Sequence, residues 1–186
     1  MNDPKRVSEQ TTSAESAWRT ELRNILTSSS QSRKVALVGM GHPFCSDDFA
    51  GSYLVKKLAV QGGKKLPEGI YLFDGEDNVE ALIMKISQLE PENVIFADTC
   101  EMKAEPGETR LISVTETSYP FFTTHGVPLK LLAEQLLVGS QVWVLAIQPK
   151  KTDFGEHLSP EIQAAVDSAS DFFLGILKEK SREVDN

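Results

Sequence analysis

The chain has 186 residues, of which 40% are hydrophobic and 25% charged, the usual balance of a globular domain large enough to bury a core. Its formal net charge is −8. This charge argues against nucleic acid and anionic membranes as partners, because both attract basic surfaces. The sequence contains neither a run of eighteen apolar residues nor the apolar core of a signal peptide, so we expect a cytoplasmic protein.

The first 33 residues differ in composition from the rest of the chain. They contain seven serines, and residues 28–32 have the composition of a flexible linker. Before that linker, Trp18, Leu22, Ile25 and Leu26 recur at helical spacing. We therefore predict a polar extension over residues 1–33 and a single domain over 34–186. The extension should contain a short amphipathic helix that docks on the body or, alternatively, on a partner.

From residue 34 onward, apolar strand-like runs alternate with helical patterns. Buried strands are predicted at 35–40, 69–73, 93–97 and 141–147, with an edge strand of alternating character at 109–114. Helices are predicted from Ser46 through Leu58, over 79–89, over 128–137 and from Pro160 onward. This order predicts a three-layer α/β/α sandwich around a mostly parallel, twisted sheet.

Three polar residues, Asp48, Asp98 and His125, each follow a strand-like run. The carboxyl ends of parallel strands gather at one edge of an open sheet, where ligands bind. Two carboxylates and one imidazole converging there could hold a divalent metal, with oxygen and nitrogen donors suited to nickel or zinc. We therefore treat these residues as candidate catalytic and metal-contacting residues. His42, in a predicted loop, is a further candidate to line the site.

Each of these residues also has an ordinary explanation. Asp48 and its neighbour Asp47 could stabilise the N-terminus of a helix, a role in which Asp47 serves the cap and Asp48 faces the cleft. Asp98 could cap the following turn through its own side chain. His125 could be a polar loop residue. Because no single residue decides the question, the inference rests on their shared position at the edge of the sheet.

The two cysteines, Cys45 and Cys100, are too few for a disulfide framework. Both follow predicted strands at the same edge of the sheet as the polar residues. They could be thiol ligands or redox-active neighbours of the site, or simply small, half-buried side chains.

A dinucleotide site is a weaker alternative. Gly39 and Gly41 lie between a strand and a helix, but Phe44 occupies the position where the dinucleotide fingerprint requires a third glycine. Two acids follow at once and would repel a pyrophosphate. We therefore expect no nucleotide cofactor.

Five short motifs occur in one order along the chain: residues 38–48 (Val-Gly-Met-Gly-His-Pro-Phe-Cys-Ser-Asp-Asp), 73–75 (Phe-Asp-Gly), 95–98 (Ile-Phe-Ala-Asp), 123–125 (Thr-Thr-His) and 147–149 (Ile-Gln-Pro). This series resembles the hydrogenase maturation endopeptidases, which process the large subunit of [NiFe] hydrogenases. It is most similar to the branch that serves hydrogenase 3-type enzymes. The resemblance spans roughly residues 34–178 and leaves the N-terminal segment unexplained.

The resemblance implies an α/β/α hydrolase, an aspartic-type endopeptidase, that removes a C-terminal extension from the large-subunit precursor after nickel insertion. Asp48, Asp98 and His125 would contact the metal, and Asp74 of the Asp-Gly turn would line the site. We expect the nickel to arrive with the precursor, the precursor to be the partner, and the enzyme to be a monomer. The alternative from another class is a non-catalytic nickel-binding module that delivers or checks the metal.

The chain departs from the family pattern at two positions. His42 stands where the family commonly has asparagine, and Phe49 stands where it commonly has glycine. These differences affect the expected substrate preference more than the expected metal contacts.

Overall fold

The computed structural model describes residues 17–27, 33–63, 66–76, 78–114, 123–124 and 127–184. Its central sheet has five strands in the order β2-β1-β3-β7-β4. They are β1 (Val35–Met40), β2 (Ile70–Glu76), β3 (Asn93–Thr99), β4 (Thr109–Ser113) and β7 (Gln141–Ile147). Four of them are parallel, and β4 pairs antiparallel with β7 at one edge.

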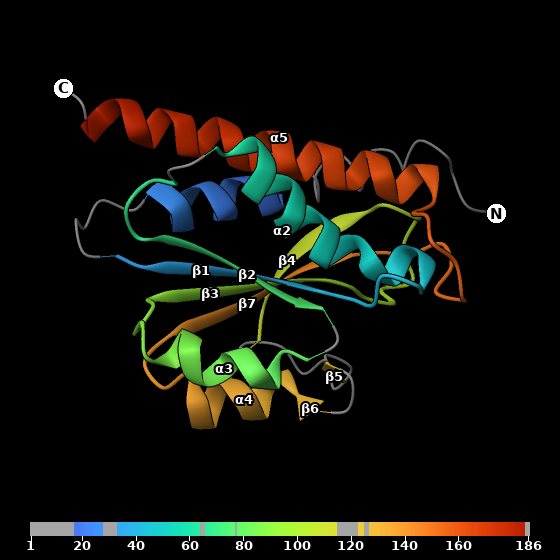
Figure 1. Ribbon diagram of the computed structural model, residues 1–186, viewed down its shortest axis with the longest axis horizontal. Helices are drawn as coiled ribbons and strands as arrows, with labels where there is room; N and C mark the ends of the chain where they lie inside the picture. The colour runs from blue at the N-terminus through green and yellow to red at the C-terminus, as the bar shows by residue number, and fades with distance from the viewer. Residues whose placement is uncertain are drawn as a thin grey trace.

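Helices cover both faces of this sheet (Figure 1). The helix of residues 17–27, α2 (Ala50–Gln61) and α5 (Pro160–Val184) pack on one face, and α3 (Glu80–Ser87) and α4 (Leu129–Leu136) pack on the other. The three-layer sandwich with a mostly parallel sheet is therefore confirmed. Among the described residues, no helix is both long enough and apolar enough to span a membrane.

The apolar run of β1 is uninterrupted because the strand is covered on both sides. Val35 and Leu37 belong to the hydrophobic cluster of α2 and α5, whereas Ala36, Val38 and Met40 belong to the cluster of α3 and α4. Successive side chains of a strand point to opposite faces, so every position must be apolar when both faces are buried.

The amphipathic helix expected near the N-terminus is present over residues 17–27 and docks on the body. Trp18 is 3% exposed, Leu22 is completely buried, and both belong to the same cluster as α2 and α5. The guanidinium of Arg19 lies 5.1 Å from the centre of the Trp18 ring and 5.5 Å from that of Phe172 on α5. The boundary at residue 33 stays a prediction.

Two strands extend further than their apolar runs. β2 continues through Asp74 to Glu76, and β3 continues through Asp98 to Thr99. Asp74 pairs with Gly39 of β1, and Asp98 pairs with Ala146 of β7. Backbone pairing persists at this edge after the side chains have become polar, so both aspartates lie inside strands rather than just after them.

The end of the strand-like run before His125, Thr123–Thr124, does not join the central sheet. β5 (Thr123–Thr124) pairs with β6 (Val127–Pro128) in a separate two-stranded sheet. Pairing across two intervening residues costs little loop-closure entropy, and Pro128 has no N–H to donate in a central ladder. Because Pro128 belongs to β6, α4 begins at Leu129. His125 itself lies outside the described residues.

Candidate functional site

Asp48 is positioned by a tight turn between β1 and α2. Gly41 has φ +114°, and a Cβ at this position would collide with the carbonyl oxygen of Asp48. The chain then forms η1 (Ser46–Phe49), a single 3-10 turn. The helix predicted from Ser46 onward thus begins with this turn, no side chain caps it, and Ser46 adopts φ 49°. Such a left-handed backbone costs on the order of 1 kcal/mol or more in a residue other than glycine.

Close backbone packing brings this turn to the end of β3. A Cβ on Gly51 of α2 would collide with the carbonyl oxygen of Ala97, which directly precedes Asp98. A Cβ on Gly39 of β1 would in turn collide with the carbonyl oxygen of Gly51. The first turn of α2 therefore rests against β1 and β3 without intervening side chains, and η1 packs against β3.

The resulting site contains two interacting carboxylates. An oxygen of Asp48 accepts a hydrogen bond from the backbone N–H of His42 at 2.7 Å, and an oxygen of Asp98 accepts one from the N–H of Thr99 at 2.8 Å. Burial, and to a lesser degree the negative charge of Asp48, raises the pKa of Asp98 to about 8 despite the opposing effect of the Thr99 N–H. The structure therefore brings Asp48 and Asp98 together, as the sequence predicted.

This pair suits either a shared proton or a cation. Two carboxylates in a half-buried site cannot both ionise without strong repulsion, and a bound proton or a divalent cation relieves it. Within the described ranges, no three His, Cys, Asp or Glu side chains come close enough together to hold a metal ion. His125, the third predicted contact, is outside those ranges, so its role stays a prediction.

Asp47 has a different role from the one that the sequence suggested. Its carboxylate is completely buried and lies away from its own helix. One oxygen accepts from the N–H groups of Lys150 and Lys151 and from the hydroxyl of Ser159, and the other accepts from the N–H of Ser159. Ser159 directly precedes α5. Asp47 therefore ties η1 to the loop before α5 and to the start of that helix.

His42 is held by its own loop. Its Nδ1 accepts a hydrogen bond from the N–H of Phe44 at 3.2 Å, which places the proton of the neutral ring on Nε2. In this arrangement the imidazole offers a donor rather than a metal-binding lone pair. The Sγ of Cys45 lies 3.7 Å from the same Nδ1, a contact that the sequence did not reveal. Since Nδ1 already has a partner, it is poorly placed to take a proton from the thiol.

Both cysteines are free and half-buried. Burial, together with the nearby charge of Asp98, raises the pKa of the Cys100 thiol far above its usual value. A thiol must lose its proton to act as a nucleophile or a metal ligand. For Cys100, the structure therefore favours the ordinary interpretation of a small, half-buried side chain.

Asp74 is engaged by α2. One carboxylate oxygen accepts from the hydroxyl of Ser52, and the other lies 3.0 Å from the ammonium of Lys56. Lys56 also contacts Glu76 at 2.8 Å and lies over the ring of Phe49. Asp74 thus lies at the expected edge of the sheet with its charge compensated, and its role as a site-lining residue remains a prediction.

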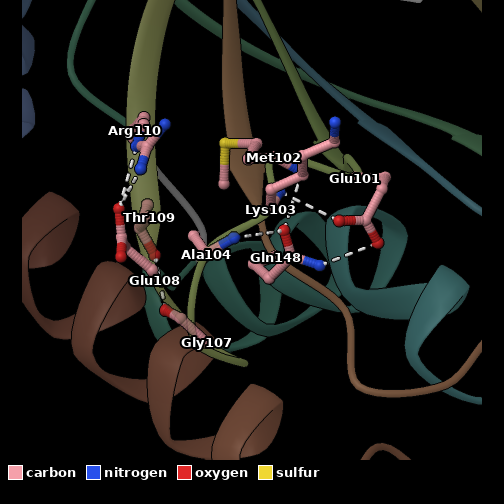
Figure 2. A network of polar contacts seen from close by, with 9 residues as sticks. All are labelled: Glu101, Met102, Lys103, Ala104, Gly107, Glu108, Thr109, Arg110 and Gln148. Atoms are coloured by element: carbon pink, nitrogen blue, oxygen red, sulfur yellow. Dashed lines mark hydrogen bonds and ion pairs between the residues drawn. The ribbon is translucent and has the colours of Figure 1, made fainter. Parts of the chain in front are cut away.

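Gln148 has a structural role beside the site that was not predicted from the sequence. It directly follows β7 and is 4% exposed. Figure 2 shows its side-chain oxygen accepting from the N–H groups of Met102 and Ala104, while its side-chain nitrogen donates to Glu101. Its backbone carbonyl accepts from the N–H of Gly107. Gln148 therefore shapes the loop that leaves the Asp98 strand. Its position in the sequence, a polar residue directly after an apolar strand-like run, could have pointed to this role.

In the same loop, Gln148 also helps to hold the carboxylate of Glu101. The N–H of Lys103 and the amide of Gln148 both donate to Glu101, and they lower the pKa of this exposed carboxyl (Figure 2). Lys103 has φ 54°, so the loop also stores backbone strain. The loop after β3 is thus built by specific polar contacts rather than by apolar packing.

Comparison with known proteins gives a consistent result. A family model described as hydrogenase maturation protease matches residues 52–176, a range that includes Asp98 and His125 and begins after Asp48. The hydrogenase 3 maturation protease of Escherichia coli is 32% identical over 135 residues, which cover 71% of this chain and 83% of that protein. A putative hydrogenase maturation protease of Methanocaldococcus jannaschii is 26% identical over 153 residues, covering 79% and 90% respectively.

Solved structures agree with these matches. The crystal structure of the [NiFe] hydrogenase maturation protease HycI from Thermococcus kodakarensis superposes with a TM-score of 0.70 at 25% identity. The superposition covers 84% of this chain and 98% of that one.

Proposed function

The chain belongs to the hydrogenase maturation protease family and is an endopeptidase, and on that premise we propose that it removes a C-terminal extension from the large-subunit precursor of a [NiFe] hydrogenase. We further propose that its precursor belongs to a hydrogenase 3-type enzyme. The 32% identity to a hydrogenase 3 maturation protease supports this branch.

The observation that carries the proposal is the interaction of Asp48 and Asp98 at the carboxyl edge of the sheet. Asp48 is oriented by the N–H of His42, and its charge contributes to the raised pKa of Asp98. Two coupled carboxylates of this kind can activate water and move protons during hydrolysis of an amide bond. Together with His125, they are the proposed catalytic and metal-contacting residues.

Nickel enters this proposal as part of the substrate. A cation carried by the precursor would relieve the repulsion between Asp48 and Asp98, and it would polarise groups near the scissile bond. The precursor supplies other ligands, so the enzyme needs no complete metal cage of its own. We therefore propose that the enzyme recognises the nickel-loaded precursor and leaves the nickel-free one intact.

The test is the mass of the precursor after incubation with the purified enzyme. We expect the nickel-loaded precursor to lose a C-terminal peptide with wild type and to stay intact with Asp48→Asn. The substitution keeps the size of the side chain and can still accept from the His42 N–H, so circular dichroism should show an unchanged fold. Cleavage by Asp48→Asn at the wild-type rate would contradict the assignment of this residue.

The alternative function is a non-catalytic module that binds or checks nickel. It predicts that the protein binds the nickel-loaded precursor without changing its mass. If wild type releases a peptide and the precursor stays intact with Asp48→Asn, the result supports the protease over the non-catalytic module.

A further inference from the structure

A pair of exposed phenylalanines lies beside the candidate site. The side chains of Phe44 and Phe154 are 48% and 82% exposed, and their rings stack with centroids 6.4 Å apart and planes 23° apart. The other exposed large apolar side chains in the described residues are aliphatic and lie on or just after three different helices: Val60, Met84, Leu131 and Val138. Exposed apolar groups that gather in one place mark binding surfaces, whereas scattered ones do not.

The phenylalanine pair is held in place rather than left on loose loops. The N–H of Gly155 donates to the carbonyl of Phe44 at 2.9 Å, and the N–H of Ser46 donates to the carbonyl of Gly155 at 2.8 Å. The carboxylate of Asp47 fixes the beginning and end of the loop from Lys150 to Ser159. The surface is therefore preformed, so little conformational entropy is lost when a partner binds.

The pair is continuous with the Asp48–Asp98 site. The ring of His42 lies 5.8 Å from that of Phe44, and the N–H of His42 holds the carboxylate of Asp48. A polypeptide whose scissile bond reaches the two carboxylates therefore has the exposed rings next to its path.

We propose that Phe44 and Phe154 form a docking surface for an apolar segment of the substrate polypeptide, close to the bond that is cleaved. This inference rests on the proposed function, because the substrate is the large-subunit precursor. Aromatic side chains often provide most of the binding energy at protein interfaces. Their contribution here is to substrate binding and not to the chemical step, so it should appear in KM and leave kcat nearly unchanged.

The experiment compares cleavage of the nickel-loaded precursor by wild type, Phe44→Ala, Phe154→Ala and Phe154→Leu. We expect each alanine variant to raise KM about tenfold with kcat within about twofold of wild type, and Phe154→Leu to restore most of the binding. Val60→Ala and Val138→Ala are matched controls, because these side chains are 81% and 80% exposed. They lie near the amino-terminal ends of the parallel strands, whereas the site lies at their carboxyl ends. KM values for the phenylalanine variants equal to those of the controls would overturn the inference.

Binding of the precursor to immobilised enzyme separates this inference from the proposed function. If wild type cleaves nothing, the proposed function fails. The docking surface is then supported if Phe154→Ala weakens binding about tenfold and Val138→Ala does not. It is overturned if the precursor does not bind or binds both variants equally. Size-exclusion chromatography tests the competing occupant: a wild-type dimer that Phe154→Ala dissociates would assign the surface to a second copy of this chain and overturn the inference.

Discussion

Asp47 and Asp98 lie at the same edge of the sheet, but their surroundings are opposite. The carboxylate of Asp47 receives four hydrogen bonds from Lys150, Lys151 and Ser159. Among the described residues, the carboxylate of Asp98 receives one from Thr99, and it faces the negative charge of Asp48.

This difference separates a structural acid from a candidate catalytic one. A buried carboxylate with a full set of donors has its charge stabilised and has no need of a ligand. A carboxylate with few donors and a like charge nearby is held in an unfavourable state that a proton, a cation or a substrate can relieve. The Asp47 contacts therefore build the edge, and the Asp48–Asp98 pair is available for chemistry there.

The largest expected effect is a loss of cleavage activity when Asp98, rather than Asp47, is the acid that is changed. We predict that Asp98→Asn lowers the single-turnover cleavage rate on the order of a thousandfold, because an amide cannot replace a carboxylate in proton transfer. The melting temperature should be equal to that of wild type or higher. Asp171→Asn is the control, since Asp171 is exposed on α5 and its neighbour Ser170 contacts Gln61 at the C-terminal end of α2, whereas the pair lies at the other end of that helix. If Asp98→Asn cleaved the precursor as fast as wild type, Asp98 would not be a catalytic acid, and its contrast with Asp47 would have no functional meaning.

The second prediction concerns stability. Asp47→Ala should lower the free energy of unfolding by about 3 kcal/mol, because four donors, of which the two from Ser159 are buried, lose their acceptor. Ser159→Ala removes only the hydroxyl donor and should cost about 1 kcal/mol. Urea denaturation measures both values. Equal stability of Asp47→Ala and wild type would show that Asp47 is not a structural acid.

The third prediction concerns pH in a metal-free buffer. The pKa of Asp98 is about 8 in the folded state and near 4 in the unfolded chain, so over this range the folded state binds the extra proton. Wild type should therefore lose stability relative to Asp98→Asn as the pH rises from 4 to 8, by about 2 kcal/mol in total because Asp98 is only half-buried. Chemical denaturation of both proteins across this range measures the difference. A constant difference would contradict the raised pKa.

The smallest expected effect tests the loop beside the pair. Gln148→Leu removes the acceptor of the Met102 and Ala104 N–H groups, so we expect a loss of about 1–2 kcal/mol in stability and an approximately fivefold slower cleavage. Glu108→Gln is a control, because Glu108 lies in the same segment and its side chain contacts Arg110 instead of Gln148 (Figure 2). A variant with slower cleavage and unchanged KM would show that the loop positions the chemistry. Wild-type cleavage would restrict Gln148 to a structural role.

Much of the fold could be predicted because its signals are local. The uninterrupted apolar run of β1 reflects burial on both faces, and the spacing of Ile162, Val166 and Phe173 gives the buried face of α5. Trp18 and its helix also follow from spacing alone. Because Leu22 is completely buried and Trp18 nearly so, deleting residues 1–32 would remove part of the core and destabilise the domain.

The parts that could not be predicted depend on long-range contacts. Asp47 and Asp48 are adjacent and chemically identical, and only the path of the loop before α5, more than a hundred residues later, decides that Asp47 is the structural one. The pairing of Thr123–Thr124 outside the central sheet depends on a competition between local and distant partners. The proximity of Asp48 and Asp98 could be predicted because the carboxyl ends of parallel strands share one edge.

The most direct test of the account is the cleavage rate of one precursor in its nickel-loaded and nickel-free forms, followed by mass spectrometry with the same wild-type enzyme. If the Asp48–Asp98 pair acts on a precursor that brings its own cation, the loaded form loses its C-terminal peptide and the nickel-free form stays intact. Equal rates for the two forms would contradict the account.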